Sequence, residues 1–218
     1  MQLFKINLQQ TAINTYISRT KQQLAAYKTT QMEKTNKKLT IAIDMDGVLA
    51  DIEEHFITWY HRDYGVLIKR EDMLGKPEAE SFPDNKAVRK FVNTDGFFRT
   101  IPVMPGAIEI VKELMEDFDV YIVSAAMEFP QSLIEKYYWL QEHFPFISWK
   151  NIVLCGDKSI IDTDYLIDDH CKNLDFCQGK AIMFNAGHNY HIDRHQRVNN
   201  WEEVRTLLKK ELELKENP

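Results

Sequence analysis

The sequence has few cysteines and no long apolar segment. Its 218 residues include three cysteines, Cys155, Cys171 and Cys177, an odd number with no CxxC pair, so we expect reduced thiols. No run of about 18 apolar residues occurs, and the N-terminus lacks the apolar centre of a signal peptide. These absences predict a cytoplasmic protein without a membrane partner.

Acidic residues are missing from the first 31 positions. Residues 1–40 carry seven basic residues against one acid, whereas residues 41–218 carry 20 against 32, and the whole chain has a net charge of -6. A chain with this balance does not resemble a nucleic-acid-binding protein. The basic segment fits a weak amphipathic helix, a disordered leader or an upstream extension of the reading frame. We expect residues 1–38 to be an extension, poorly ordered or a lone helix, that contributes nothing to chemistry.

Short apolar runs alternate with amphipathic stretches along the rest of the chain. Strands are expected at 39–43, 118–124, 152–155, 165–167 and 181–184, and helices near 106–117, 132–143 and 201–214. Such alternation predicts an α/β, Rossmann-like fold with a parallel five-stranded sheet and helices on both faces. We assign residues 39–51 and 104–214 to this core.

Residues 52–103 contain no convincing central strand. Apolar side chains between Ile52 and Tyr60 recur at helical spacing, and Gly65 is a suitable helix end. The segment therefore predicts a small helical insertion after the first strand. Its aromatic residues either pack in a core or face a pocket and stack on a base.

The first strand ends in Asp44-Met45-Asp46-Gly47. Burying a carboxylate is costly unless it is paired or bound to a metal. A solvated turn is the simplest interpretation of this motif alone. The alternative is a site in which one aspartate attacks phosphorus and the other moves a proton, with Mg²⁺ between them.

Polar groups also follow the other strands. Ser124 ends the second strand, Lys158 follows the third, and Asp168-Asp169 ends the fourth. Because the carboxyl ends of parallel strands lie along the same edge of a sheet, we expect these groups to meet in one cleft. Solvated turns would have to occur independently in four places, so a functional site is the favoured interpretation.

These residues carry a resemblance to a known family. DMDGV at 44–48, Ser124, Lys158 and Asp168-Asp169 match, in order, the four motifs of the haloacid dehalogenase-like phosphatases. The longer strings DMDGVLAD, GFFRTIPVMPGA, VYIVSAA, GDKSII and LIDDH resemble the 5'(3')-deoxyribonucleotidases, over roughly residues 39–210.

The resemblance implies a catalytic role for each residue. Asp44 is the candidate nucleophile, which forms an aspartyl-phosphate, and Asp46 is the general acid and base. Ser124 donates a hydrogen bond to a phosphoryl oxygen, and Lys158 holds the same group by its charge.

A Mg²⁺ site is implied at the same place. Asp44, Asp168 and the main-chain carbonyl of Asp46 would hold the ion. Asp169 would orient a ligand or bind through water.

The resemblance further makes residues 52–103 a helical cap over the cleft. The candidates for contact with the substrate are Ile52, Trp59, Phe97, Phe98 and Ala125. Ile52 and Gly156 stand where the better-studied animal enzymes carry an aromatic residue and an arginine, which leaves the base preference open.

The expected function is a Mg²⁺-dependent phosphatase of (deoxy)nucleoside monophosphates, with a small-molecule nucleotide as substrate and no nucleic-acid partner. The alternatives are a phosphatase of another small ester such as a sugar phosphate, a non-catalytic binding domain, or a nucleic-acid-associated protein that uses the basic leader. A homodimer is left open.

Three histidines near the C-terminus raise a separate question. His188, His191 and His195 have a spacing that would fit one face of a helix and a transition-metal site. Gly187 and the polar neighbours favour a loop, so we do not expect a metal there.

Overall fold

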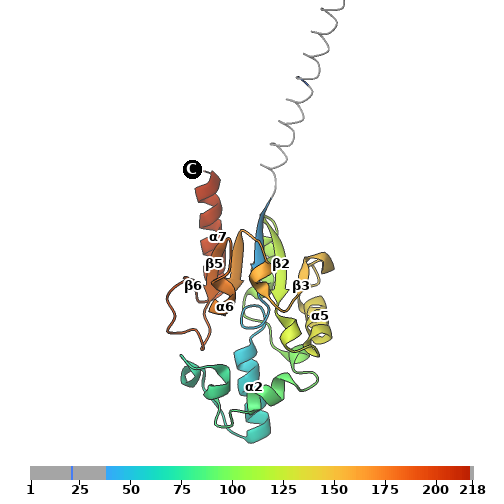
Figure 1. The fold of residues 1–218 in the computed structure, drawn as a ribbon, viewed down its shortest axis with the longest axis vertical. Helices are drawn as coiled ribbons and strands as arrows, with labels where there is room; N and C mark the ends of the chain where they lie inside the picture. Colours follow the sequence, from blue (N-terminus) through green and yellow to red (C-terminus); the bar gives the residue numbers. More distant parts are fainter. Residues whose placement is uncertain (1–20, 22–37, 217–218) are drawn as a thin grey trace, which may run out of the picture. The chain divides into compact units, whose positions relative to one another are not determined.

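The structure is a computed structural model that describes residue 21 and residues 38–216 (Figure 1). The chain divides into two units, Met1–Lys38 and Leu39–Pro218. Apart from residues 21 and 38, the expected N-terminal extension lies outside the described residues. None of the helices in the described part has both the length and the apolar character that a membrane crossing needs.

A parallel sheet forms the centre of the Leu39–Pro218 unit, with its strands in the order β3-β2-β1-β4-β5-β6 (Figure 1). The strands are β1 Leu39–Ile43, β2 Phe118–Ser124, β3 Ile152–Leu154, β4 Tyr165–Asp168, β5 Lys180–Phe184 and β6 Gln196–Val198. The predicted parallel sheet is confirmed, but the predicted five strands are wrong. The sixth strand has three residues, Gln-Arg-Val, of which only the valine is buried, so it lacks an apolar pattern.

The strand order reverses at β1, which lies between β2 and β4. Ile43, the last residue of β1, pairs with Ile122 of β2 and Ile167 of β4. The carboxyl ends of these three strands therefore lie side by side at the place where open α/β sheets bind their ligands.

Both faces of the sheet are covered. Alternate β1 residues contribute to different cores: Ile41 and Ile43 to a large one, Ala42 to a small one. The large core includes residues of α4 Ala107–Leu114, α5 Ser132–His143 and α7 Trp201–Glu216, and the small core includes α6 Cys171–Leu174. Helices on both faces were predicted, and this is confirmed.

The segment between β1 and α4 leaves and rejoins the sheet at one point. The Asp51 amide donates to the Pro102 carbonyl at 2.8 Å, and the Met104 amide donates to the Leu49 carbonyl at 2.7 Å. Between these contacts lie α2 Ile52–Tyr64 and α3 Ala87–Val92, with short 3-10 helices η1 Arg70–Met73, η2 Glu78–Ser81 and η3 Phe98–Thr100. In Figure 1, α2 lies beyond the carboxyl ends of the strands.

Three more 3-10 helices follow strands or helices of the sheet region. They are η4 Ala126–Glu128, η5 Trp149–Asn151 and η6 Lys158–Ile160.

Candidate active site

Asp44 directly follows the last residue of β1 and lies at the carboxyl edge of the sheet. Its amide donates to the Ile167 carbonyl at 2.9 Å, and its own Oδ1 accepts from the Met45 amide at 2.7 Å. The chain then turns tightly, with the Leu49 and Ala50 amides both donating to the Met45 carbonyl. This backbone fixes the buried Asp44 carboxylate in place.

Three buried carboxylates meet beside a buried lysine. One carboxylate oxygen from each of Asp44, Asp168 and Asp169 lies within 4.8 Å of the other two. Lys158 Nζ, from η6, is 2.6 Å from both Asp44 Oδ1 and Asp168 Oδ2, and the lysine is only 3% exposed. Asp168 Oδ1 also accepts from the Asn173 side chain at 3.0 Å. The predicted meeting of strands one, three and four is thus present.

Three carboxylates share one lysine, and the pKa values of two of them, Asp44 and Asp169, are raised. Burial, with the charge of Asp168, raises the pKa of Asp44 to about 7 although Lys158 opposes the shift. Burial likewise raises the pKa of Asp169 well above its ordinary value. Burial would lower the pKa of Lys158, but the two carboxylates raise it above its ordinary value. The cluster therefore favours a further positive charge.

The donor set fits a hard divalent cation. Such ions prefer carboxylate and carbonyl oxygens. Asp169 Oδ1 and Asp46 Oδ1 are buried and have no hydrogen-bond partner in the described part of the chain, which is unusual for such oxygens. Asp169 stands closer to this cluster than the sequence predicted, because its carboxylate joins those of Asp44 and Asp168.

The Asp46 carboxylate has a different partner, Lys136 of α5. Lys136 Nζ lies 2.5 Å from Asp46 Oδ2 and donates to Ser124 Oγ at 3.0 Å, and the lysine is 2% exposed. Sequence reasoning missed this residue. The signal was there, because Lys136 lies four residues before Leu140 and four after Ser132, on the buried side of α5.

A cavity of about 530 Å³ opens beside these groups. Of the predicted substrate contacts, Ile52, Phe98 and Ala125 line it. Further apolar walls come from Phe56, Val88, Val92 and Phe129, and charged side chains from Glu78, Arg89, Glu128 and Lys172. The cavity thus joins the carboxyl edge of the sheet to the segment 52–103.

The other two predicted contacts, Trp59 and Phe97, do not line this cavity. Phe97 is fully buried and Trp59 is 9% exposed, and their rings pack edge to face at 5.0 Å. Both rings also contact Phe91 and His55. They differ from the prediction because helical spacing identifies an apolar side of α2 but cannot distinguish the part that faces the cavity from the part that faces the core.

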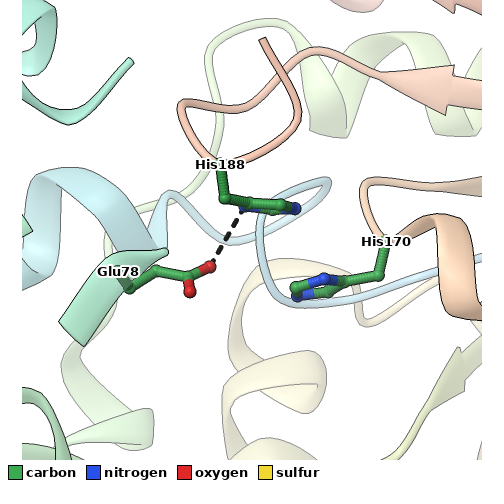
Figure 2. A group of neighbouring side chains, drawn as sticks. All are labelled: Glu78, His170 and His188. Carbon is green, nitrogen blue, oxygen red and sulfur yellow. Dashed lines mark ion pairs between the residues drawn. The ribbon is translucent and has the colours of Figure 1, made fainter. Parts of the chain in front are cut away.

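The three C-terminal histidines are not brought together as one group. Figure 2 shows His188 beside Glu78. The His188 ring also contacts the Asp169 carbonyl, whereas His195 contacts Asp175 at 2.8 Å. Burial alone would lower the pKa of His188, but the hydrogen bond to Glu78 and the charge of Asp169 raise it to about 9. His188 therefore carries a charge at neutral pH and compensates part of the acidic cluster.

Gly47 provides a direct test of the carboxylate geometry. Its φ is +74°, and a Cβ at this position would lie 2.2 Å from Asp169 Oδ2. We expect Gly47→Ala to displace Asp169 and weaken Mg²⁺ binding at least tenfold in a calorimetric titration. Gly65→Ala is the matched control, because Gly65 has φ +71° with nothing within 4 Å of the added Cβ. Equal Mg²⁺ affinity in the two variants would contradict the placement of Asp169 at a cation site.

The chain is similar to several known proteins. The family model described as "5' nucleotidase, deoxy (Pyrimidine), cytosolic type C protein" matches residues 37–214. A Staphylococcus epidermidis protein that carries the provisional name of a 5'(3')-deoxyribonucleotidase is 44% identical over 169 residues, which are 77% of this chain and 94% of that protein. The 5'(3')-deoxyribonucleotidase of Bacillus subtilis is 40% identical over 171 residues, 78% of this chain and 99% of that protein.

A solved structure supports the fold. The haloacid dehalogenase-like family hydrolase from Streptococcus pneumoniae aligns with a TM-score of 0.50 at 13% identity and covers 78% of this chain and 98% of that one. The resemblance to the 5'(3')-deoxyribonucleotidases is confirmed by the family model and the relatives. The chain belongs to the 5'(3')-deoxyribonucleotidase family.

Proposed function

We propose that the chain is a Mg²⁺-dependent phosphomonoesterase that hydrolyses (deoxy)nucleoside monophosphates through an aspartyl-phosphate on Asp44. The observation that carries this proposal is the buried carboxylate cluster at the end of a cavity with largely apolar walls. The cluster suits an ion and a phosphoryl group, and the walls suit a nucleoside. The family membership of the chain supports the same activity.

Asp44, Asp168 and Asp169 would hold the ion, together with the main-chain carbonyl of Asp46. When bound, Mg²⁺ would offset the negative charge of the carboxylates and of the phosphoryl oxygens. Asp169 Oδ1, which is buried and has no hydrogen-bond partner among the described residues, supports this assignment.

The first chemical step is the attack of an Asp44 oxygen on phosphorus. Lys158, 2.6 Å away, favours the ionised form of Asp44 that this attack requires. As the new bond forms, the bond from phosphorus to the ester oxygen breaks, and protonated Asp46 gives its proton to that oxygen. In the second step Asp46 takes a proton from water, the water oxygen attacks phosphorus, and the bond to Asp44 breaks.

Lys136 and Ser124 act on the phosphoryl side of the site. Lys136 contacts both Asp46 and Ser124, so it holds the proton-transfer group and the hydroxyl donor at a fixed separation. Ser124 Oγ then presents its hydrogen to a phosphoryl oxygen.

The segment 52–103 acts as the cap in this proposal. It contributes Ile52, Phe56 and Phe98 to the cavity and would exclude water while it contacts the leaving nucleoside. The three free cysteines are consistent with action in the reducing cytoplasm.

Phosphate release from a panel of substrates tests the activity. The panel contains 5'- and 3'-deoxynucleotides, ribonucleotides, sugar phosphates and an aryl phosphate, each with Mg²⁺ and with EDTA. We expect turnover of deoxynucleotides that EDTA removes and that Asp44→Asn lowers by at least about 10³-fold. Turnover of sugar phosphates alone would contradict the nucleotide assignment, and absence of all Mg²⁺-dependent turnover would contradict the phosphatase proposal.

Neutralising the Asp44 carboxylate is expected to make the metal-free protein more stable. The pKa of Asp44 is about 7 in the fold against an ordinary 3.8, so its protonated form stabilises the metal-free protein. That contribution is fully present below pH about 4 and is lost as the pH rises through about 7. We expect the Tm of the metal-free wild type to fall relative to that of Asp44→Asn over this range.

Mg²⁺ should reverse this difference at pH 7. We expect the ion to raise the Tm of the wild type more than that of Asp44→Asn. A wild type that is more stable than Asp44→Asn at pH 7 without metal would show that Lys158 already compensates the carboxylates fully.

A further inference from the structure

A second group of candidate ligands lies close to the carboxylate cluster. Glu78, His170 and His188 each have one donor atom within 4.8 Å of the donor atoms of the other two (Figure 2). They come from three separate segments: η2 of the inserted segment, the residue after Asp168-Asp169, and the loop after β5. We propose that these three residues form a binding site for a borderline divalent cation such as Zn²⁺ or Co²⁺, separate from the Mg²⁺ site.

The donor chemistry separates the two sites. Two imidazoles and one carboxylate suit Zn²⁺ or Co²⁺, whereas Mg²⁺ prefers oxygen ligands alone. The Asp44, Asp168 and Asp169 cluster offers only oxygens. Excess Mg²⁺ should therefore occupy the carboxylate cluster and leave the histidine site to the softer ion.

His188 is already oriented as metal-bound histidines are. Its Nε2 lies 3.1 Å from the Asp169 carbonyl, the kind of hydrogen bond that fixes the ring of a ligating histidine. Its other nitrogen, Nδ1, lies 3.1 Å from Glu78 Oε1. Two donors at this separation can both lie about 2.0–2.2 Å from one ion, which would displace the Nδ1 proton to solvent and replace the direct contact between them.

His170 supplies the third donor. Its ring stacks on that of His188, with the centroids 4.2 Å apart and the planes at 18°. Its imidazole makes no hydrogen bond with the described part of the chain, so its nitrogens are available. Because nearly parallel rings do not direct their nitrogens at one point, the ring must rotate about its side-chain bonds when the ion binds. Glu78 and His170 line the cavity, which leaves water a fourth position.

The location gives such an ion a structural consequence. Glu78 belongs to the segment 52–103, and both histidines belong to the carboxyl edge of the sheet. An ion held by all three would tie the two parts together beside the cavity.

Cobalt is the probe that tests the site, because its visible spectrum reports its coordination. The full-length protein is titrated with Co²⁺ in excess Mg²⁺. We expect the protein to bind one Co²⁺ per chain. The bound Co²⁺ should show the intense visible absorption of a four-coordinate ion with nitrogen ligands, and Zn²⁺ should displace it. We expect His170→Ala and Glu78→Gln each to weaken Co²⁺ binding at least tenfold.

His191→Ala is the matched control. It removes an imidazole from the loop that carries His188, but His191 packs near Gly75 and belongs to no group of candidate ligands among the described residues. We expect it to bind Co²⁺ as the wild type does. Glu78→Gln preserves the shape of the side chain, so it remains informative if His170→Ala does not fold.

Two results would overturn the proposal. One is the absence of the four-coordinate spectrum in the wild type with Mg²⁺ present. The other is a spectrum that persists in Glu78→Gln and is lost in Asp168→Asn, which would assign Co²⁺ to the carboxylate cluster.

Discussion

The contact of Lys158 with two aspartates is the interaction on which the active site depends. Its ammonium group lies 2.6 Å from Asp44 and 2.6 Å from Asp168, and all three side chains are buried. Without this charge, three carboxylates within 4.8 Å would repel one another in a medium of low dielectric constant. Lys158 therefore makes the cluster tolerable but does not neutralise it.

The remaining charge imbalance supports the proposed cation site. Asp46 adds a fourth carboxylate and Lys136 a second ammonium group, so the acids still exceed these two lysines by two charges. His188, which is charged beside Asp169, offsets part of that excess, and a divalent cation would offset the rest. Lys136 leaves one oxygen of Asp46 without a partner, and Asp169 has another such oxygen. The same excess makes the metal-free site costly, as the raised pKa of Asp44 indicates.

The fold brings these groups together because of where the strand order reverses. β1 lies between β2 and β4, so residues at the ends of three strands meet although they are about 80 and 124 positions apart in the sequence. The inserted segment begins after Asp51 and ends near Pro102, and a hydrogen bond between these two residues joins its ends beside this edge. It is therefore positioned to form one wall of the cavity.

The sequence predicted what local pattern determines. A few residues are enough to recognise the buried apolar runs that end in Asp44, Ser124 and Asp168. Because parallel strands have their carboxyl ends at one edge of the sheet, these runs also predict that the three side chains lie near one another. Glu78 could not be assigned this way, since its partners are fixed by tertiary packing, and Lys136 is marked only by its spacing from Ser132 and Leu140 on the buried side of α5. For Trp59 and Phe97, the sequence indicates burial without saying whether a core or a cavity is the neighbour. The sequence did not predict β6 because its residues, two of which are polar, show no apolar strand pattern.

The covalent intermediate is the most direct test of the account. The protein is mixed with Mg²⁺ and a deoxynucleotide that carries a radiolabelled phosphate, quenched in acid during turnover, and digested for peptide mapping. The account predicts label on the peptide that contains Asp44, with none in Asp44→Asn. Turnover without any labelled protein, or label on a different peptide, would contradict the assignment of Asp44 as the nucleophile.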